Sequence, residues 1–434
     1  MIDPAIWPLG TSVDRSGRLR VGGADTVALA DRLGTPLYVY DAATIRDAYR
    51  RYVAAFRAAR PARPVRISYA IKACALRGVA AILADAGADA SAASLGELLA
   101  AKRAGFAMSH TQLHGNAKTD DELRAALRLG VGRVVIDGAD EIERLGRLVA
   151  RRARSQSVWL RVSPGIGADT HPHLRTGLLD SKFGAPIAGG DALAQCRAIA
   201  ATKNLTLVGI HAHLGTQLHE AERYRELAEA LAALARDVHA TTGTALREIA
   251  VGGGLGIALR TGDPALDLAA YAREITAPIR VDPTLGRVIM YVEPGRSLVG
   301  RAGVALYRVV GTKRVAGVRT FVSVDGGMGD NIRPALYGAG YTAVLAGRAA
   351  SAPAEHVAVA GKYCESGDLL IRDVALPTAE PGDVLAIPAT GAYSVAMASN
   401  YNHHPRPAVA LVDDGRARVI RTRETHADIW RLER

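Results

Sequence analysis

The chain has 434 residues, of which 49% are hydrophobic, and this is enough for two domains that each bury a core. Its net charge of +11 is spread over arginines in alanine-rich segments, and only 5% of its residues are aromatic, so the composition argues against binding of nucleic acid. An acidic, proline-containing start, the lack of an apolar run of membrane-spanning length, and three cysteines without C-x-x-C spacing predict a soluble, cytoplasmic protein with no membrane contact and no disulfide framework.

Short apolar runs recur from residue 65 onward, each followed by a polar or glycine-rich corner and a longer helical pattern. This alternation is typical of βα units and a parallel sheet. The runs expected to be strands are 66–72, 87–91, 111–116, 133–138, 157–165, 207–217, 248–256 and 288–296. Eight such units predict a TIM-like (β/α)8 barrel, with the active site at the carboxyl ends of its strands.

Beyond about residue 300 the pattern changes to alternating strands with tight turns. The strand-like segments are 319–329, 355–362, 382–391 and 407–420. We expect them to form a second, carboxyl-terminal domain, a β-sandwich or β-barrel. The early segment "TPLYVYD", residues 35–41, resembles these strands and is expected to join them. The predicted domains are therefore a barrel at 42–299 and a β-rich domain from 1–41 and 300–434.

Chemically distinctive residues stand where the apolar runs stop. Lys72, Asn116, His213, Glu293 and Arg296 each lie at the end of such a run, so a barrel would direct them to one mouth. A lysine at the end of a buried strand either extends its ammonium to the surface or is used through its amine. The clustering favours use of the amine.

The glycine run "VGGGLG", residues 251–256, has two interpretations. It either brings backbone amides close to an anion or makes a tight barrel corner. It does not fit the G-x-G-x-x-G nucleotide motif, because Ile257 occupies the last glycine position, and the sequence contains no Walker phosphate loop. A nucleotide-binding fold is therefore not expected.

Histidines recur in three places. The motif "HAHLGTQ", residues 211–217, puts two histidines on one side of a strand, where they could be metal ligands, a ring-stacking surface or core residues. The histidines at 171–173 and 403–404 lie in polar sequence that is typical of solvated loops. No metal site is predicted.

Seven short motifs together resemble a known family. The words "YAIKA", "HAHLGTQ", "GGGLG", "EPGR", "RPALYGA", "CESGD" and "GAYSVAMASNYN" occur in the order found in the diaminopimelate decarboxylases. That family belongs to the alanine-racemase-like, fold-type-III enzymes that use pyridoxal 5′-phosphate. The resemblance extends from "GTPLYVYD" to "VIRTRET", which is nearly the whole chain.

The resemblance implies a set of cofactor-binding residues. Lys72 would hold pyridoxal phosphate covalently through its amine, His213 would stack on the pyridine ring, and Glu293 would pair with the ring nitrogen. The phosphate cradle and the residue that closes it would be Thr216, Gly253, Gly254, Gly295, Arg296 and Tyr393.

The resemblance also implies a substrate site. Arg296, Arg333 and Tyr337 would hold the distal carboxylate, beside Tyr393, and Glu365 would pair with the distal ammonium. Cys364 would be the acid that returns a proton to the carbon that has lost CO2. Lys72, His213 and Cys364 are thus the expected catalytic residues. In the family the "CESGD" turn comes from the neighbouring subunit, so a head-to-tail homodimer with shared active sites is implied.

The sequence departs from the family pattern at a few positions. Cys74 stands where a polar residue such as asparagine is usual after the lysine. Ser91 stands where an aspartate is usual near the second strand, with Asp89 two positions earlier. His403 and His404 replace a more usual arginine or apolar residue. These departures leave the groups that perform the chemistry intact.

The activity that the resemblance implies is decarboxylation of meso-2,6-diaminopimelate to L-lysine and CO2, the last step of lysine biosynthesis. The runner-up is a decarboxylase of another amino acid on the same fold, such as ornithine, lysine or carboxynorspermidine. A metal-dependent barrel hydrolase that uses the H-x-H pairs is a second class. A catalytically inactive regulator of the same fold is a third, although the presence of Lys72 and Cys364 disfavours it.

Overall fold

The computed structural model describes residues 2–150, 154–166, 181–264 and 267–434, and the chain forms two compact units. Residues 49–256 and 266–295 make up the barrel unit. Residues 1–48, 257–265 and 296–434 make up the β-rich unit. The described segment 257–264, which falls inside the predicted barrel range, therefore belongs to the β-rich unit.

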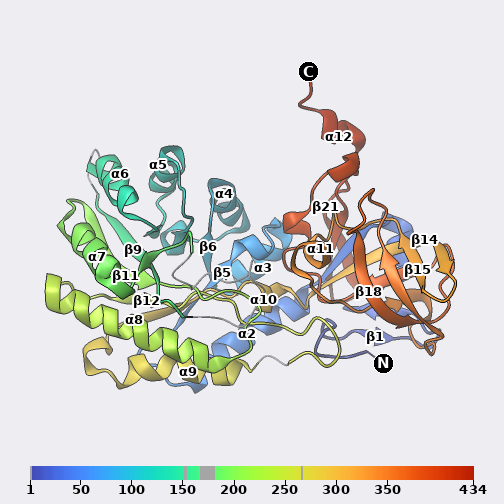
Figure 1. The fold of residues 1–434 in the computed structure, drawn as a ribbon, viewed down its shortest axis with the longest axis horizontal. Helices are drawn as coiled ribbons and strands as arrows, with labels where there is room; N and C mark the ends of the chain where they lie inside the picture. Colours follow the sequence, from blue (N-terminus) through green and yellow to red (C-terminus); the bar gives the residue numbers. More distant parts are fainter. Residues whose placement is uncertain (1, 151–153, 167–180, 265–266) are drawn as a thin grey trace. The chain divides into compact units, whose positions relative to one another are not determined.

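Parallel strands form a closed barrel in the first unit (Figure 1). Among the described residues its eight strands, in sheet order, are β5 (Arg66–Ala70), β6 (Asp89–Ala92), β7 (Thr111–Leu113), β8 (Arg133–Ile136), β9 (Gln156–Ser163), β11 (Leu205–His211), β12 (Glu248–Ala250) and β13 (Ile289–Val292). Pairing of β13 with β5 closes the ring, and the short β10 (Ala185–Pro186) adds to β9. Each strand coincides with one of the apolar runs, so the predicted (β/α)8 barrel is confirmed.

Helices surround the barrel strands (Figure 1). They are α3 (Arg77–Asp85), α4 (Leu95–Ala104), α5 (Asp120–Leu129), α6 (Ala139–Ala150), α7 (Asp191–Ala201), α8 (Ala221–Thr242) and α9 (Leu268–Val281). Local sequence fixes their ends, as α5 illustrates. Thr119 and Glu122 form a reciprocal capping box at its start, and Gly130, with φ 72°, ends it in the left-handed conformation. The division of the chain falls inside helix α2 (Ala42–Ala58): residues 42–48 belong to the β-rich unit and residues 49–58 to the barrel unit.

A mixed sheet organises the β-rich unit. Strand β4 (Leu37–Asp41) lies between β14 (Gly303–Val315), to which it is antiparallel, and β20 (Ala408–Asp413), to which it is parallel. The prediction that 35–41 joins the later strands is confirmed. The other strands are β1 (Ser12–Val13), β2 (Leu19–Val21), β3 (Ala24–Asp25), β15 (Arg319–Val324), β16 (Val344–Leu345), β17 (Glu355–Ala360), β18 (Leu369–Leu376), β19 (Val384–Ile387) and β21 (Arg416–Arg421). The helices are α1 (Thr26–Leu33), α10 (Arg296–Val299), α11 (Arg333–Tyr337) and α12 (His426–Trp430).

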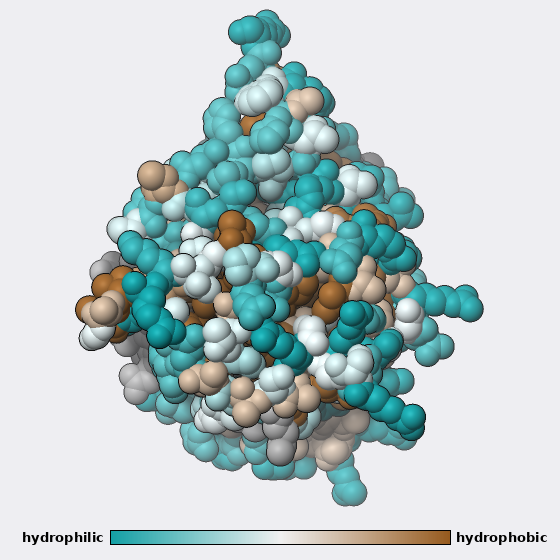
Figure 2. Space-filling view, turned by 90° about the vertical axis from the view of Figure 1, so that its right-hand side faces the viewer, coloured by the Kyte–Doolittle hydropathy of each residue, from teal (hydrophilic) through white to brown (hydrophobic). Residues whose placement is uncertain are grey.

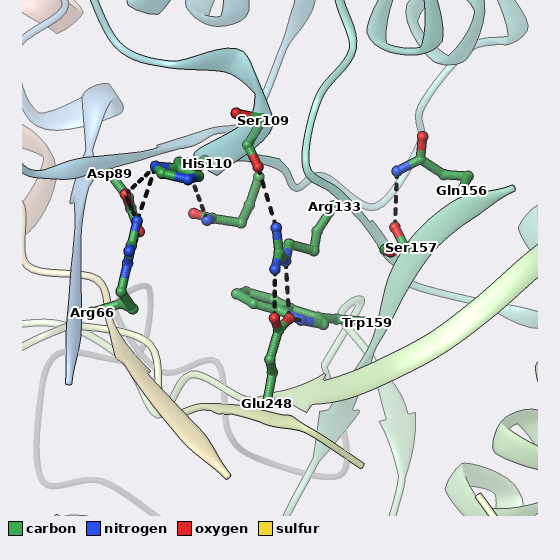
Figure 3. A network of polar contacts seen from close by, with 10 residues as sticks. Arg66, Asp89, Ser109, His110, Arg133, Gln156, Ser157, Trp159 and Glu248 are labelled. Atoms are coloured by element: carbon green, nitrogen blue, oxygen red, sulfur yellow. Dashed lines mark hydrogen bonds and ion pairs between the residues drawn. The ribbon is translucent and has the colours of Figure 1, made fainter. Parts of the chain in front are cut away.

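Two charge pairs, each a buried carboxylate with a partly exposed arginine, occupy the amino-terminal end of the barrel (Figure 3). Arg66, Asp89, Arg133 and Glu248 are the first residues of β5, β6, β8 and β12. Arg66 Nε donates to Asp89 Oδ2 at 2.8 Å, and Arg133 Nε donates to Glu248 Oε2 at 2.9 Å. Trp159 Nε1 also donates to Glu248 Oε2, at 2.7 Å. This end of the barrel is opposite the carboxyl ends of the strands, where the active site of such a barrel lies. We therefore assign these pairs a structural role, which is to link neighbouring parts of the barrel.

Hydrophilic residues prevail on the face shown in Figure 2, with hydrophobic residues scattered among them. Isolated exposed hydrophobic side chains are normal on a folded domain. In the described part of the chain, no helix has both the length and the apolar character needed to span a membrane.

Candidate active site

Lys72 stands at the carboxyl end of β5. The strand ends at Ala70 and continues into a short 3-10 helix, Ile71–Ala73. Ile71 and Ala73 are buried, whereas the Lys72 side chain is exposed. The turn is thus anchored by its apolar neighbours while the amine is accessible to a ligand, which is the position the sequence predicted.

The turn after β13 packs against the lysine turn. The Ala70 N–H donates to the Pro294 carbonyl at 3.0 Å. A Cβ atom at Gly295 would lie only 3.1 Å from the Cβ of Ala73 and 3.2 Å from that of Ala70. Gly295 is therefore required for the close approach of these two strand ends.

His213 follows β11 in a loop at the same end of the barrel. Its pKa is lowered well below the usual range, mainly by burial and then by the positive charges of Lys72 and Arg161. The imidazole is therefore neutral near pH 7. The loop is fixed by backbone bonds, since the Leu218 N–H donates to the Gly254 carbonyl at 3.1 Å and the Gly256 N–H donates to the Leu218 carbonyl at 2.7 Å.

Close backbone contacts explain the glycine run. A Cβ at Gly253 would lie 2.1 Å from the Glu293 carbonyl oxygen, and one at Gly254 would lie 2.1 Å from the Gly215 carbonyl oxygen. Gly254 also has a φ of 107°, which favours glycine. The tight-corner interpretation thus accounts for both residues, and their part in a phosphate cradle with Thr216 stays a prediction.

Glu293 is a buried carboxylate directly after β13, held between two histidines. His211 Nε2 lies 3.0 Å from Oε2 in a hydrogen bond, and His114 Nε2 lies 2.9 Å from Oε1. Burial opposes the charge of the carboxylate, but the interactions with His114 and His211 outweigh it and hold the Glu293 pKa well below its usual range. Burial lowers the pKa of His211 to about 4, so this imidazole is neutral near pH 7.

The Glu293 carboxylate retains capacity for a ligand. Its Oε1 accepts no hydrogen bond with good angular geometry from the described residues, although His114 lies within ion-pair distance. A buried anionic oxygen of this kind is expected to have a donor. A protonated pyridine nitrogen is such a donor, and the accessible Lys72 amine at the same end of the barrel can react with an aldehyde. The residues present therefore fit pyridoxal phosphate.

In the β-rich unit, two buried arginines flank one tyrosine ring. The guanidinium carbons of Arg296 and Arg333 lie 4.8 Å and 5.9 Å from the centre of the Tyr393 ring. Arg333 also lies 5.4 Å from the Tyr337 ring centre, and its Nε donates to the Tyr341 hydroxyl at 3.2 Å. Burial, and then the like charge of Arg333, lower the pKa of Arg296 to about 10. Two cations so placed favour binding of an anion.

The turn that carries Cys364 and Glu365 leaves both side chains exposed. Asp368 shapes the turn, because its carboxylate accepts the N–H groups of Met328 at 2.6 Å and Tyr363 at 2.9 Å. The Cys364 N–H donates to the Asn402 side chain at 3.0 Å. The roles of Cys364 and Glu365 at a shared site stay predictions.

The family departures differ in their surroundings. Asp89 pairs with Arg66 at the amino-terminal end of β6 and so does not face the mouth, whereas Ser91 lies two residues further along the strand. The buried Cys74 accepts the Tyr69 hydroxyl through its carbonyl at 2.9 Å. The histidines at 403–404 lie beside aromatic rings, with His403 accepting from the indole of Trp430 and the His404 ring edge-on to Tyr363. The histidines at 171–173 are outside the described residues.

Sequence reasoning missed His114 and did not choose a role for His211. With Glu293 they bring three potential metal-ligand atoms within 4.8 Å of one another. In the sequence, His114 appears only as a histidine in the strand end "TQLHGN", and His211 only as the first histidine of the H-x-H pair. Neither motif indicates that the two histidines contact the same carboxylate.

Comparisons with known proteins give the family. Residues 42–300 match the family described as "Pyridoxal-dependent decarboxylase, pyridoxal binding domain". The diaminopimelate decarboxylase of Actinosynnema pretiosum subsp. auranticum is 43% identical over 100% of this chain and 96% of its own length, and that of Bacillus subtilis is 39% identical over 98% and 97%. The crystal structure of diaminopimelate decarboxylase from M. jannaschii in co-complex with L-lysine is similar with a TM-score of 0.91 and 30% identity, over 98% of this chain and 97% of that one. The chain therefore belongs to the diaminopimelate decarboxylases, within the pyridoxal-dependent decarboxylases.

Proposed function

We propose that this chain converts meso-2,6-diaminopimelate to L-lysine and CO2 with pyridoxal 5′-phosphate as cofactor. The observation that carries the proposal is the buried, ionised Glu293 with an available oxygen at the same end of the barrel as the exposed amine of Lys72. The solved relative from M. jannaschii that contains L-lysine, the product of this reaction, supports the choice of substrate.

The bound cofactor would supply an electron sink for the pair released when CO2 leaves. Lys72 would bind its aldehyde covalently through the accessible amine. Glu293 would accept the ring N–H and so keep the ring nitrogen protonated. The neutral ring of His213 would cover one face of the cofactor and exclude water from it.

The charged residues of the β-rich unit would select the substrate. The guanidiniums of Arg296 and Arg333 would bind the distal carboxylate, with the Tyr337 and Tyr393 rings fixing their planes. Glu365 would pair with the distal ammonium.

We further propose that Cys364 protonates the carbon that loses CO2 and that it reaches the site of a neighbouring subunit. The exposure of Cys364 supports this assignment. The active form would then be a homodimer with shared active sites. A cytoplasmic location belongs to the same proposal, and the free thiols of all three cysteines agree with a reducing compartment.

The test compares kcat/KM for meso-diaminopimelate, L-lysine and L-ornithine. L-lysine and L-ornithine lack the distal carboxylate and would leave the arginines without their anion, so we expect the first substrate to be preferred at least about a thousandfold. Arg333→Met should narrow the gap, chiefly by lowering the rate on diaminopimelate. The matched control Arg314→Met removes an arginine that is 74% exposed and should leave the preference unchanged. Comparable rates on all three substrates would instead favour a decarboxylase of another amino acid.

A further inference from the structure

Three barrel strands direct one residue each onto a common point. His211 is the last residue of β11, His114 follows β7, and Glu293 follows β13. The three residues are 2%, 7% and 8% exposed. Because they come from separate strands, only the closed barrel brings them together.

His211 makes the better-formed contact with the carboxylate. Its Nε2 and Glu293 Oε2 are 3.0 Å apart in a hydrogen bond, so Nε2 carries the proton in the neutral imidazole. His211 Nδ1 has no hydrogen-bond partner among the described residues. The ring of His114 stands edge-on to that of His211, with 4.7 Å between centres and 68° between planes. His114 therefore limits rotation of the His211 ring.

A neutral donor suits a carboxylate that must still bind a cation. An arginine or lysine at position 211 would neutralise Glu293 internally, whereas an imidazole N–H orients the carboxylate and leaves its negative charge. Without any donor the buried carboxyl group would favour its neutral form, since burial opposes the charge.

We propose that His211, braced by His114, is a positioning residue that holds the Glu293 carboxylate oriented and ionised for the ring nitrogen of pyridoxal phosphate. The inference rests on the proposed function, because it needs the cofactor ring beside Glu293. It assigns His211 no contact with the cofactor.

The test measures how strongly each full-length variant prefers pyridoxal phosphate over an analogue whose ring nitrogen is replaced by a C–H group, 1-deazapyridoxal 5′-phosphate. The readout is the ratio of the two dissociation constants. The wild-type chain should prefer pyridoxal phosphate by roughly tenfold or more, the usual effect of one charge-assisted hydrogen bond. In His211→Leu the ratio should fall several-fold below the wild-type value, because only His114, whose contact with the carboxylate is less well aligned, then remains beside Glu293. Because the ratio is internal to each variant, a partly unfolded preparation does not alter it.

Two amide variants make the test sharper. The side chain of glutamine can place an N–H near the position of Nε2, whereas the shorter asparagine reaches only the position of Nδ1. His211→Gln should therefore keep most of the wild-type preference, and His211→Asn should show the same decrease as His211→Leu. Glu248→Gln serves as the control, because it alters the other end of the same barrel and should leave the ratio unchanged.

The possible outcomes separate the inference from the function. If the wild-type chain does not prefer pyridoxal phosphate over the deaza analogue, the role of Glu293 in the proposed function is wrong. If the wild-type chain prefers pyridoxal phosphate and both His211→Leu and His211→Asn show the wild-type ratio of dissociation constants, the proposed function stands. The positioning role of His211 is then refuted.

Discussion

Replacing Glu248 with glutamine should destabilise the barrel unit by about 2 to 3 kcal/mol, because it leaves the Arg133 guanidinium without its anion. Glu248 is 5% exposed, and both its oxygens accept from Arg133. The hydrogen bond to Glu248 raises the pKa of Arg133, so the pairing favours the charged form of the guanidinium.

The magnitude follows from burial. Removal of one partner of a fully buried ion pair costs about 3 to 5 kcal/mol. The Arg133 side chain retains 19% exposure, so water can partly solvate it after the substitution, and the cost falls below that range, to about 2 to 3 kcal/mol. Glutamine keeps an oxygen for the indole N–H of Trp159, so that hydrogen bond adds little to the loss.

The assay is urea unfolding at pH 7 followed by Trp159 fluorescence, with Trp7 and Trp430 replaced by phenylalanine so that the signal reports on the barrel unit alone. The matched control is Glu143→Gln, which breaks a pair whose side chains are 66% and 73% exposed and should cost less than about 0.5 kcal/mol. Equal losses in Glu248→Gln and Glu143→Gln would refute the reasoning, since the buried pair would then behave as a solvated one.

Further predictions concern the catalytic groups and a buried acid. Lys72→Ala should abolish turnover and the borohydride-reducible chromophore without changing the unfolding midpoint, and retention of both would place the covalent link elsewhere. Mixing inactive Lys72→Ala and Cys364→Ala chains should restore about a quarter of wild-type activity, since roughly half the dimers are mixed and each has one intact site; no recovery despite proven subunit exchange would put both groups in one chain. Burial raises the pKa of Asp330 to about 7, so its folded form binds the proton more tightly than the unfolded chain does. Stability of the β-rich unit should fall as pH rises from about 4 to 7, and urea midpoints of Asp330→Asn should show a shallower fall; an unchanged slope would contradict this.

The barrel could be read from the sequence because parallel strands buried on both faces appear as apolar runs. Several strands of the β-rich unit were not expected from the sequence, among them β18 and the long β14, which joins β4, β15 and β19. Strand β14 shows the reason. Its first half is buried, but its second half, Gly311–Val315, is polar and largely exposed. An apolar pattern therefore covers only part of the element, and the rest looks like a loop.

The residues of the candidate site could be predicted from the sequence only where a single short motif contains the residue concerned. Lys72, His213 and Glu293 stand in short recognisable motifs, so their positions at the carboxyl ends of barrel strands could be predicted, while their roles stay predictions. The contacts of His114 with Glu293 and of Arg133 with Glu248 depend on the register of the closed barrel. Arg133 and Glu248 are 115 positions apart in the sequence. No local pattern encodes such a pairing, and this is why both buried clusters appear only in the structure.

The position of β4 has a consequence for how the chain is made. Its sheet partners β14 and β20 begin at Gly303 and Ala408, whereas the last barrel strand is complete at Val292. On the ribosome, the barrel unit can close while β4 is still waiting for both neighbours, since domains fold as units during synthesis. A proteolytic cut or premature stop just before Ala408 would leave one side of β4 as an open strand edge, which is prone to aggregation. Loss of β20 would thus expose β4, although the two strands are far apart in the sequence.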